Sequence, residues 1–443
     1  MGRVRVLLIS TYELGHQPFG LASPAAWLRA AGHEVTLADL SRAPLPDPAV
    51  EAAEFIGFYL PMHTATRLFL PLMERVRALN PNARLCVYGL YAPLNEDLLR
   101  RAGIHTVIGG EFEKALVDAV GQASGLSSVT SLERQQFLPP DRIGLPPLTA
   151  YARLIHNGVS RTVGYTEATR GCKHRCRHCP VVPVYQGVFR VVQPEVVLED
   201  IRRQIAAGAE HITFGDPDFF NGPGHAVKIV ESLHREWPSL TYDVTIKIEH
   251  ILQHRDLLSL LSTTGCLFIT SAVESLDDAV LERLAKGHTH ADFLAALAWT
   301  RAAGLPLAPT FIPFTPWATL QAYQSFLREL VALDLIDQVA PIQLAIRLLI
   351  PEGSLLLELP EIRDMVGPFD ARSLCYPWRH ANPALDRLCA SLQDLIKQED
   401  RRHGTRPETF RKIATLAWGS QFPPDEPRVS RAAIPYLTEP WYC

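Results

Sequence analysis

The chain has 443 residues, a hydrophobic fraction of 47% and a net charge of −4. This length predicts two or three domains. The near-neutral charge excludes the strong basic field that nucleic acids and anionic membranes attract, so we expect neither partner. No run approaches the ~18 apolar residues of a membrane span. The N-terminal MGRVRVLLIS is expected to be a strand and not a signal peptide. Three clustered and five scattered cysteines are typical of a reduced, cytoplasmic enzyme.

Short apolar strands alternate with helices from residue 1 to about 125. Strands are expected at 4–10, 34–40, 55–60, 84–89 and 106–108, with helices at 22–31, 64–79, 95–102 and 114–120. This alternation predicts a parallel, doubly wound, Rossmann-like sheet whose ligands lie beyond the carboxyl ends of the strands. Candidate binding residues in those loops are His63, Gly89, Gly109, Gly110 and Glu111.

The segments LRAAGHEVTLADL (28–40) and IGGEFE (108–113) resemble the cobalamin-binding domain found before many radical SAM domains. The resemblance implies that the five candidate residues bind cobalamin. The loop after the first strand, TYELGHQPFG (11–20), contains His16. It lacks the D-x-H-x-x-G motif of the branch that ligates cobalt through histidine. We therefore expect cobalamin without a protein histidine below the cobalt; the alternative is a domain that keeps the fold without the cofactor.

Composition changes between residue 121 and about 158, where the serine-rich GQASGLSSVTS is followed by FLPPDRIGLPPL. Proline fixes φ and removes a hydrogen-bond donor, so this segment is expected to be an extended connector. The predicted organisation is a first domain over 1–125, a linker over 126–160, a second domain over 161–354 and a C-terminal cap and tail over 355–443.

The segment TRGCKHRCRHCP (169–180) places Cys172, Cys176 and Cys179 at C-x3-C-x2-C spacing, directly after an expected strand at 162–169. Three thiolates can hold three irons of a cubane and leave the fourth iron open, whereas a cluster on four cysteines has every iron filled. An open iron is useful where a substrate chelates it. The spacing thus favours a [4Fe–4S] cluster with one free coordination position.

Two other metal sites are compatible with this loop. A zinc site needs four ligands, and His174 or His178 could be the fourth. A ferredoxin-like cluster needs another cysteine, and the next one, Cys266, is remote in sequence.

The whole segment closely resembles the cysteine motif of the radical SAM family. That resemblance implies S-adenosylmethionine (SAM) chelated at the open iron, cleavage of its S–C5′ bond by an electron from the cluster, and an electron donor such as flavodoxin or ferredoxin. Many members have an aromatic residue where this chain has His178, so the adenine contact there is not carried over.

Five further strands are expected at 210–215, 242–248, 266–273, 307–313 and 339–346. With the motif strand they predict a partial (β/α)6 TIM barrel, whose site lies at the carboxyl ends of the strands. The fold class is therefore α/β: a Rossmann-like domain, a partial barrel, and a helical, aromatic C-terminal segment.

Three of the strand ends carry polar residues that we assign to SAM. The resemblance places the segment FGDPDFF (214–220) where radical SAM proteins hold the methionine ammonium with backbone and an acidic side chain; a carboxylate suits that cation, although the segment is also good turn chemistry. The segment IKIEH (246–250) follows the third strand, and AVES (272–275) resembles the G-x-E-S segment that approaches the SAM ribose in the family. The candidates are Asp216, Asp218, Lys247, Glu249, Glu274 and Ser275.

The C-terminal part is expected to form helices at 386–402 and 407–416 and is rich in aromatic residues, which either close the barrel mouth or form core. Arg347 is a candidate carboxylate or phosphate clamp, with a structural ion pair equally favoured.

The sequence given ends in AAIPYLTEPWYC, at Cys443. Together with TRGCKHRCRHCPVVPVY and FIPFTPW, this end resembles the radical SAM group named for a CUAEP or CCAEP tail. The resemblance implies a catalytic role for Cys443, as a thiol that binds a soft element, forms a redox pair or carries a substrate. The paired residue is absent here. One explanation is a selenocysteine codon read as a stop; the alternative is a terminus without a role.

The predicted function is radical SAM methylation of an unreactive carbon in a small molecule or peptide, with a [4Fe–4S] cluster, SAM and cobalamin. One alternative is cobalamin-independent radical chemistry on a substrate held by tail thiols. Another is a non-catalytic electron-transfer protein, against which the presence of both Asp216 and Glu274 argues.

Overall fold

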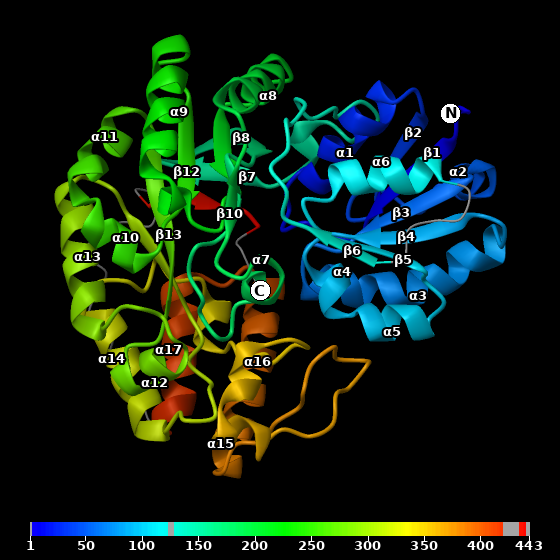
Figure 1. The fold of residues 1–443 in the computed structure, drawn as a ribbon. Helices are drawn as coiled ribbons and strands as arrows, with labels where there is room; N and C mark the ends of the chain where they lie inside the picture. Colours follow the sequence, from blue (N-terminus) through cyan, green and yellow to red (C-terminus); the bar gives the residue numbers. More distant parts are fainter. Residues whose placement is uncertain (1, 123–127, 420–433, 440–443) are drawn as a thin grey trace.

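The computed structural model describes residues 2–122, 128–419 and 434–439. Two α/β units lie side by side, with the C-terminal helices below the second unit in the view of Figure 1. The tail prediction for Cys443 lies outside the described residues.

The first unit is a six-stranded parallel sheet in the order β2-β1-β3-β4-β5-β6. Its strands are β1 (Arg5–Ser10), β2 (Glu34–Asp39), β3 (Phe55–Tyr59), β4 (Arg84–Tyr88), β5 (Thr106–Gly110) and β6 (Ser128–Ser131). The inner strands β1, β3, β4 and β5 are mostly buried because helices cover both faces, whereas the edge strands β2 and β6 are more exposed. The doubly wound prediction is confirmed, and the strand order reverses between β1 and β3.

Six helices sandwich this sheet. Residues of α1 and α6 build the core on one face, and residues of α2, α3, α4 and α5 build the core on the other. The helices are α1 (Phe19–Ala30), α2 (Asp47–Ala52), α3 (His63–Leu79), α4 (Tyr91–Leu94), α5 (Glu96–Arg101) and α6 (Glu113–Gly121).

The proline-rich segment is more than a connector. Its start forms β6, the edge strand of the first sheet, and its end forms β7 (Arg153–His156), which pairs antiparallel with β8 (Val159–Thr166) of the second sheet. The stretch between them holds a single short turn of 3₁₀ helix, Leu148–Ala150, so the expectation of an extended chain applies there.

The second sheet has the order β14-β13-β12-β11-β8-β7-β15. Five strands are parallel, namely β8, β11 (His211–Phe214), β12 (Thr241–Thr245), β13 (Cys266–Glu274) and β14 (Leu307–Phe311). Helices α8 (Pro194–Ala206), α9 (Pro223–Glu236), α10 (Ile248–Gln253), α11 (Leu258–Thr263), α12 (Asp278–Arg283), α13 (His290–Ala302) and α14 (Leu320–Ala332) connect them and cover the outside. The partial barrel is confirmed.

The sixth strand expected at 339–346 is wrong. Residues Pro341–Leu344 form a 3₁₀ helix, and pairing in this region is reduced to one bridge between Phe314 and Arg347. Pro341 has no N–H to donate to a ladder. The side chain of Gln343 instead accepts a hydrogen bond from the backbone N–H of Phe311 at 3.0 Å, so a side chain satisfies the edge of β14.

The C-terminal region contains α15 (Pro360–Arg363), α16 (Pro383–Arg401) and α17 (Arg406–Trp418), and α16 and α17 pack on the barrel core. The short strand β15 (Tyr436–Leu437) returns to the barrel sheet and pairs antiparallel with β7. No helix among the described residues is both long and apolar enough to cross a membrane.

Candidate active site

The cysteine loop begins where β9 (Thr169–Gly171) ends and leads into α7 (Val181–Tyr185). Gly171 has φ of +72°, and a Cβ there would lie 2.3 Å from the ring of Tyr185, so the turn that starts the loop requires glycine. Cys176 is buried, Cys172 and Cys179 are partly buried, and all three thiols are free of disulfides. The loop thus presents three thiols from one short segment.

The three thiols do not form a compact ligand group of the zinc type in the described chain. A tetrahedral zinc site, with Zn–S bonds of about 2.3 Å, brings its sulfurs to within roughly 4 Å of one another. Within the described part of the chain, the group of three such ligands whose donor atoms lie within 4.8 Å of one another is His174, Asp218 and His250, without any cysteine.

The environment of the thiols also fits a bound metal centre. Burial raises the pKa of Cys172 to about 11 and that of Cys179 to about 12. A bound metal would supply the positive charge that deprotonates them. Lys286 is buried close to Cys176 and Cys179 and adds a fixed positive charge. The three cysteines are the residues that would hold the [4Fe–4S] cluster.

Asp216 and Asp218 are both buried after β11, but they face different partners. Asp216 accepts hydrogen bonds from the Thr169 hydroxyl at 2.6 Å and the Ala168 N–H at 3.0 Å, so it braces the turn before the cysteine loop. Asp218 accepts two backbone hydrogen bonds on Oδ1, from the N–H of Phe220 at 3.2 Å and from that of Lys247 at 3.5 Å. Its Oδ2 is buried and keeps acceptor capacity, so Asp218 suits an ammonium better than Asp216 does.

The segment expected to end the third strand turns earlier than predicted. Strand β12 ends at Thr245, and Lys247 precedes α10, so Glu249 lies in the first helical turn. Lys247 Nζ lies 3.0 Å from Glu249 Oε2 and 3.1 Å from His174 Nδ1. Lys247 therefore points to the cysteine loop, while Glu249 is partly exposed and pairs with Lys247.

Glu274 and Ser275 line a pocket of about 270 Å³ at the carboxyl ends of β13 and β14. Glu274 has φ of +70°, a conformation that costs a non-glycine residue energy and is typical of functional sites. Its carboxylate contacts His178 Nε2 at 3.0 Å and Lys286 Nζ at 3.3 Å. Burial opposes ionisation, yet Lys286 and His178 lower the pKa of Glu274 to about 2. The pocket is thus lined by an ionised carboxylate.

Several buried polar atoms near this pocket have no hydrogen-bond partner within the described chain. They include Thr315 Oγ1, which lines the pocket, and both ring nitrogens of His288. Buried polar groups without partners are rare, and a bound ligand, ion or water can supply the partner. Hydroxyl and base groups of SAM would satisfy such atoms, so the pocket fits the ribose and adenine of SAM.

Three residues near this site, Lys286, His288 and His250, are not among those expected from the sequence. The segment LAKGHTH (284–290) contains two of them, and its charge among apolar neighbours is the one sequence signal available. No sequence signal marks His250 as a site residue, because a single histidine near the start of a helix has no distinctive pattern.

The strand order of the first unit reverses between β1 and β3, the place where doubly wound sheets bind their ligands. Three buried polar atoms at the end of β1 and in the loop after it, Ser10 Oγ, Glu13 Oε2 and Gln17 Oε1, lack hydrogen-bond partners in the described chain. The amide groups around a corrin ring are suitable partners for them. The loop therefore fits cobalamin.

The residues expected to contact cobalamin are distributed along the same edge. Gly89 has φ of +110° and Gly110 has φ of +68°, at the ends of β4 and β5, and Gly109 packs against Pro93. His63 Nε2 is 2.6 Å from the Ser373 carbonyl, so this ring is held by the C-terminal region.

His16 is buried, and its ring packs against Tyr165 of β8 in a tilted arrangement, with centroids 4.7 Å apart. Burial lowers the pKa of His16 to about 4, so the imidazole is neutral. The expectation that no protein histidine lies below the cobalt stays a prediction.

Arg170 joins the two units at the base of the cysteine loop. Its guanidinium is buried and lies 2.7 Å from Glu113 Oε1, 3.4 Å from Glu111 Oε2 and 2.7 Å from Glu167 Oε2. The hydroxyl of Tyr185 donates to Glu111 at 3.1 Å. Glu111, expected to contact cobalamin, is thus engaged in an ion pair between the units.

Arg347 has a structural role. Its guanidinium pairs with Asp386 and lies 3.6 Å above the ring of Trp378. Trp378 is in a buried cluster with Val280 and Leu348, so this aromatic residue is core and does not close the barrel mouth.

Comparison with protein families divides the chain at the same place. Residues 166–328 match the radical SAM superfamily, and residues 5–120 match the B12 binding domain. Hopanoid C-3 methylase of Methylococcus capsulatus is 23% identical over 330 residues, which are 70% of this chain and 64% of that protein. Bacteriochlorophyllide d C-12(1)-methyltransferase of Chlorobaculum tepidum is 24% identical over 43% of this chain and 42% of its own length. The chain thus spans less than two thirds of these relatives.

Solved structures share the fold over most of the chain. The cobalamin-dependent SAM radical enzyme OxsB, with aqua-cobalamin and SAM bound, superposes with a TM-score of 0.70 at 15% identity and covers 90% of this chain and 67% of its own. The radical SAM methyltransferase TsrM from Kitasatospora setae has a TM-score of 0.57 at 14% identity, covering 75% and 73%.

Proposed function

We propose, from the premise that this chain is a radical SAM protein with an N-terminal B12-binding domain, that it methylates an unreactive carbon of a small molecule or peptide. The cofactors are a [4Fe–4S] cluster, SAM and cobalamin. An external reductant of the flavodoxin or ferredoxin type would supply electrons. The methylase and methyltransferase names of the similar proteins support the reaction class.

One structural observation carries this proposal. Val184 and Tyr185, at the end of the cysteine loop, belong to the hydrophobic core of the first unit. Arg170, two residues before Cys172, is ion-paired to Glu111 and Glu113 of that unit. The cysteine loop is therefore built against the B12-binding domain, as transfer between two cofactors requires.

When bound, the cluster supplies the electron that cleaves SAM, and cobalamin supplies methyl-group chemistry. The residues of this chain hold and orient those groups. Cys172, Cys176 and Cys179 would hold the cluster, and Asp218 would accept the methionine ammonium. Glu274 would accept hydrogen bonds from the ribose, since its ionised carboxylate is an acceptor only.

Reconstitution tests the two-cofactor proposal directly. The protein is incubated anaerobically with iron, sulfide and hydroxocobalamin, desalted, and its absorption spectrum recorded. We expect corrinoid bands beside the iron–sulfur absorbance, because the B12-binding domain supplies unpaired polar groups for the corrin. Cluster absorbance without corrinoid would contradict methyl transfer through cobalamin.

Replacing Asp218 with asparagine should weaken SAM binding, because the ammonium loses its charged partner. A charged hydrogen bond is worth about 1.5–3 kcal/mol, which corresponds to roughly a 10- to 100-fold rise in the Kd for SAM. The Kd is measured from the change in the EPR spectrum of the reduced cluster on SAM addition. Asp256→Asn, at an exposed position, is the control and should bind SAM normally. An unchanged Kd for SAM in Asp218→Asn would show that Asp218 does not bind the methionine ammonium.

A further inference from the structure

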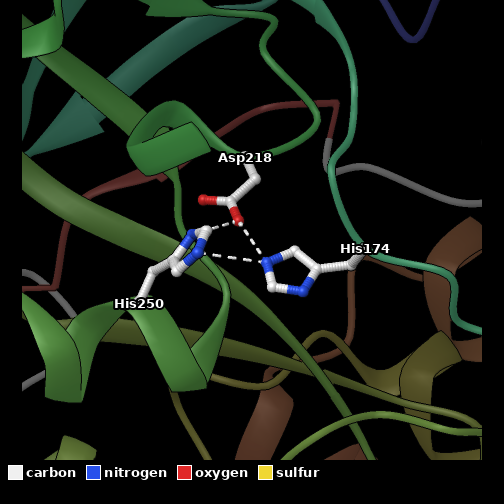
Figure 2. Close-up of side chains that lie close together, drawn as sticks. All are labelled: His174, Asp218 and His250. Atoms are coloured by element: carbon white, nitrogen blue, oxygen red, sulfur yellow. Dashed lines mark hydrogen bonds and ion pairs between the residues drawn. The ribbon is translucent and has the colours of Figure 1, made fainter. Parts of the chain in front are cut away.

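Three polar side chains from three separate elements meet beside the cysteine loop (Figure 2). His174 belongs to the loop, Asp218 follows β11, and His250 is on α10. His250 Nδ1 lies 2.6 Å from Asp218 Oδ2, and His250 Nε2 lies 3.1 Å from His174 Nε2. Asp218 and His250 are buried, and His174 is partly buried. The contacts therefore link the loop to the carboxylate that we assign to the methionine ammonium.

Lys247 fixes the direction of these contacts. Its ammonium can only donate, and Nζ lies 3.1 Å from His174 Nδ1, so Nδ1 must accept. The proton of His174 is then on Nε2, which donates to His250 Nε2. His250 in turn carries its proton on Nδ1, the atom that faces Asp218 Oδ2. Each tautomer follows from the one before it.

We propose that His250 is a positioning residue for SAM, an inference that rests on the proposed function. It orients Asp218 toward the methionine ammonium and, through His174, couples that orientation to the loop that holds the cluster. His250 is fully buried at the start of α10. No group in the described chain makes a hydrogen bond to its Nδ1 or to Asp218 Oδ2, so the close polar contact of 2.6 Å between these two atoms is what each of them has. The pair thus sets the direction of that carboxylate oxygen.

Two imidazoles and a carboxylate are also a donor set for zinc and other divalent ions. Lys247 opposes that assignment. The outer partner of a metal-bound histidine normally accepts a hydrogen bond from the ring. Here Lys247 donates, which places the proton of His174 on the nitrogen that would face the ion. The geometry therefore favours positioning, and a bound metal is an outcome that the experiment detects.

The test uses the reconstituted full-length protein with cluster bound. His250→Phe removes both polar contacts of the ring. His174→Ala removes the contact between His174 and His250 at a partly exposed position, where a substitution disturbs folding less. His250→Asn places an amide nitrogen near Nδ1 and restores the donor to Asp218. His254→Phe is the matched control, because His254 follows closely in the sequence but takes no part in the polar contacts of His174, His250 and Asp218. Iron and sulfide content and the Kd for SAM from cluster EPR are measured for each variant.

We expect wild-type iron content in all four variants. The Kd for SAM should rise roughly 10- to 100-fold in His250→Phe, the range typical of lost outer-shell partners. His174→Ala should show a smaller rise, His250→Asn should recover most of the affinity, and His254→Phe should match wild type.

Wild-type SAM affinity in His250→Phe and His174→Ala would overturn the inference. Loss of iron in both variants would also overturn the inference, because these contacts would then stabilise the iron–sulfur cluster and not position SAM. Zinc or manganese that binds to Cys172→Ala protein, and no longer binds when His250→Phe is added, would show that His174, Asp218 and His250 form a metal site. That result would also overturn the inference. If wild-type protein with its cluster shows no spectral response to SAM, the proposed function fails instead.

Discussion

Replacing Cys172, Cys176 or Cys179 with alanine, one at a time, is expected to abolish SAM cleavage. The three thiolates are the protein ligands of the cluster, so a single loss leaves two irons without protein ligands. Each variant should lose most of its iron and sulfide after anaerobic reconstitution and form no 5′-deoxyadenosine above background. Iron and sulfide assays, with product analysis in the presence of dithionite, check both outcomes.

The control thiols are Cys266 and Cys389, which are buried in the barrel core. Cys389 Sγ contacts the Ala345 carbonyl at 3.6 Å, so its sulfur already has a structural partner. Alanine at either position should leave iron content unchanged. Loss of the cluster in Cys266→Ala would instead indicate a fourth cysteine ligand, and with it an electron-transfer protein.

Most of the fold was predictable because its strands are short, apolar and regularly separated by helices. The strand expected at 266–273 is β13, and the one at 84–89 is β4. The failure at 339–346 has a physical cause. An apolar run of this length does not distinguish a strand from other buried backbone, and the Gln343 side chain that satisfies Phe311 has no sequence signature.

The candidate site was predictable where spacing carries the chemistry, as in the cysteine motif. It was less predictable where contacts depend on distant segments. Asp216 and Asp218 are equivalent in sequence, and the hydrogen bonds from Thr169 and Ala168 separate their roles. His250 required the observation that the chain turns into α10 after Lys247.

Arg170→Met should destabilise the folded protein by roughly 3–5 kcal/mol, the cost of removing one partner from a buried ion pair. The guanidinium is surrounded by three carboxylates, and its loss leaves them buried without a counter-charge. It also stacks near three phenylalanine rings, the nearest of which is Phe137 at 4.9 Å. The denaturant midpoint of the reconstituted protein, measured anaerobically, checks this. Arg202→Met, which removes exposed ion pairs to Glu199 and Glu236, is the control and should change the midpoint little.

The size of this loss should depend on pH in a defined direction. Burial raises the pKa of Glu111 and of Glu167 from 4.5 to about 7. Between these two values the folded state holds protons that the unfolded state has released, so stability decreases as pH rises from about 4.5 to 7. Without Arg170, the ionised carboxylates of Glu111 and Glu167 repel each other more strongly. The loss of stability in Arg170→Met should therefore be larger at pH 8, where both are ionised, than at pH 6. Glu111→Gln should remove part of this pH dependence. An equal loss at both values would mean that packing around Phe137, and not charge, is what Arg170 contributes where the B12-binding domain meets the cysteine loop.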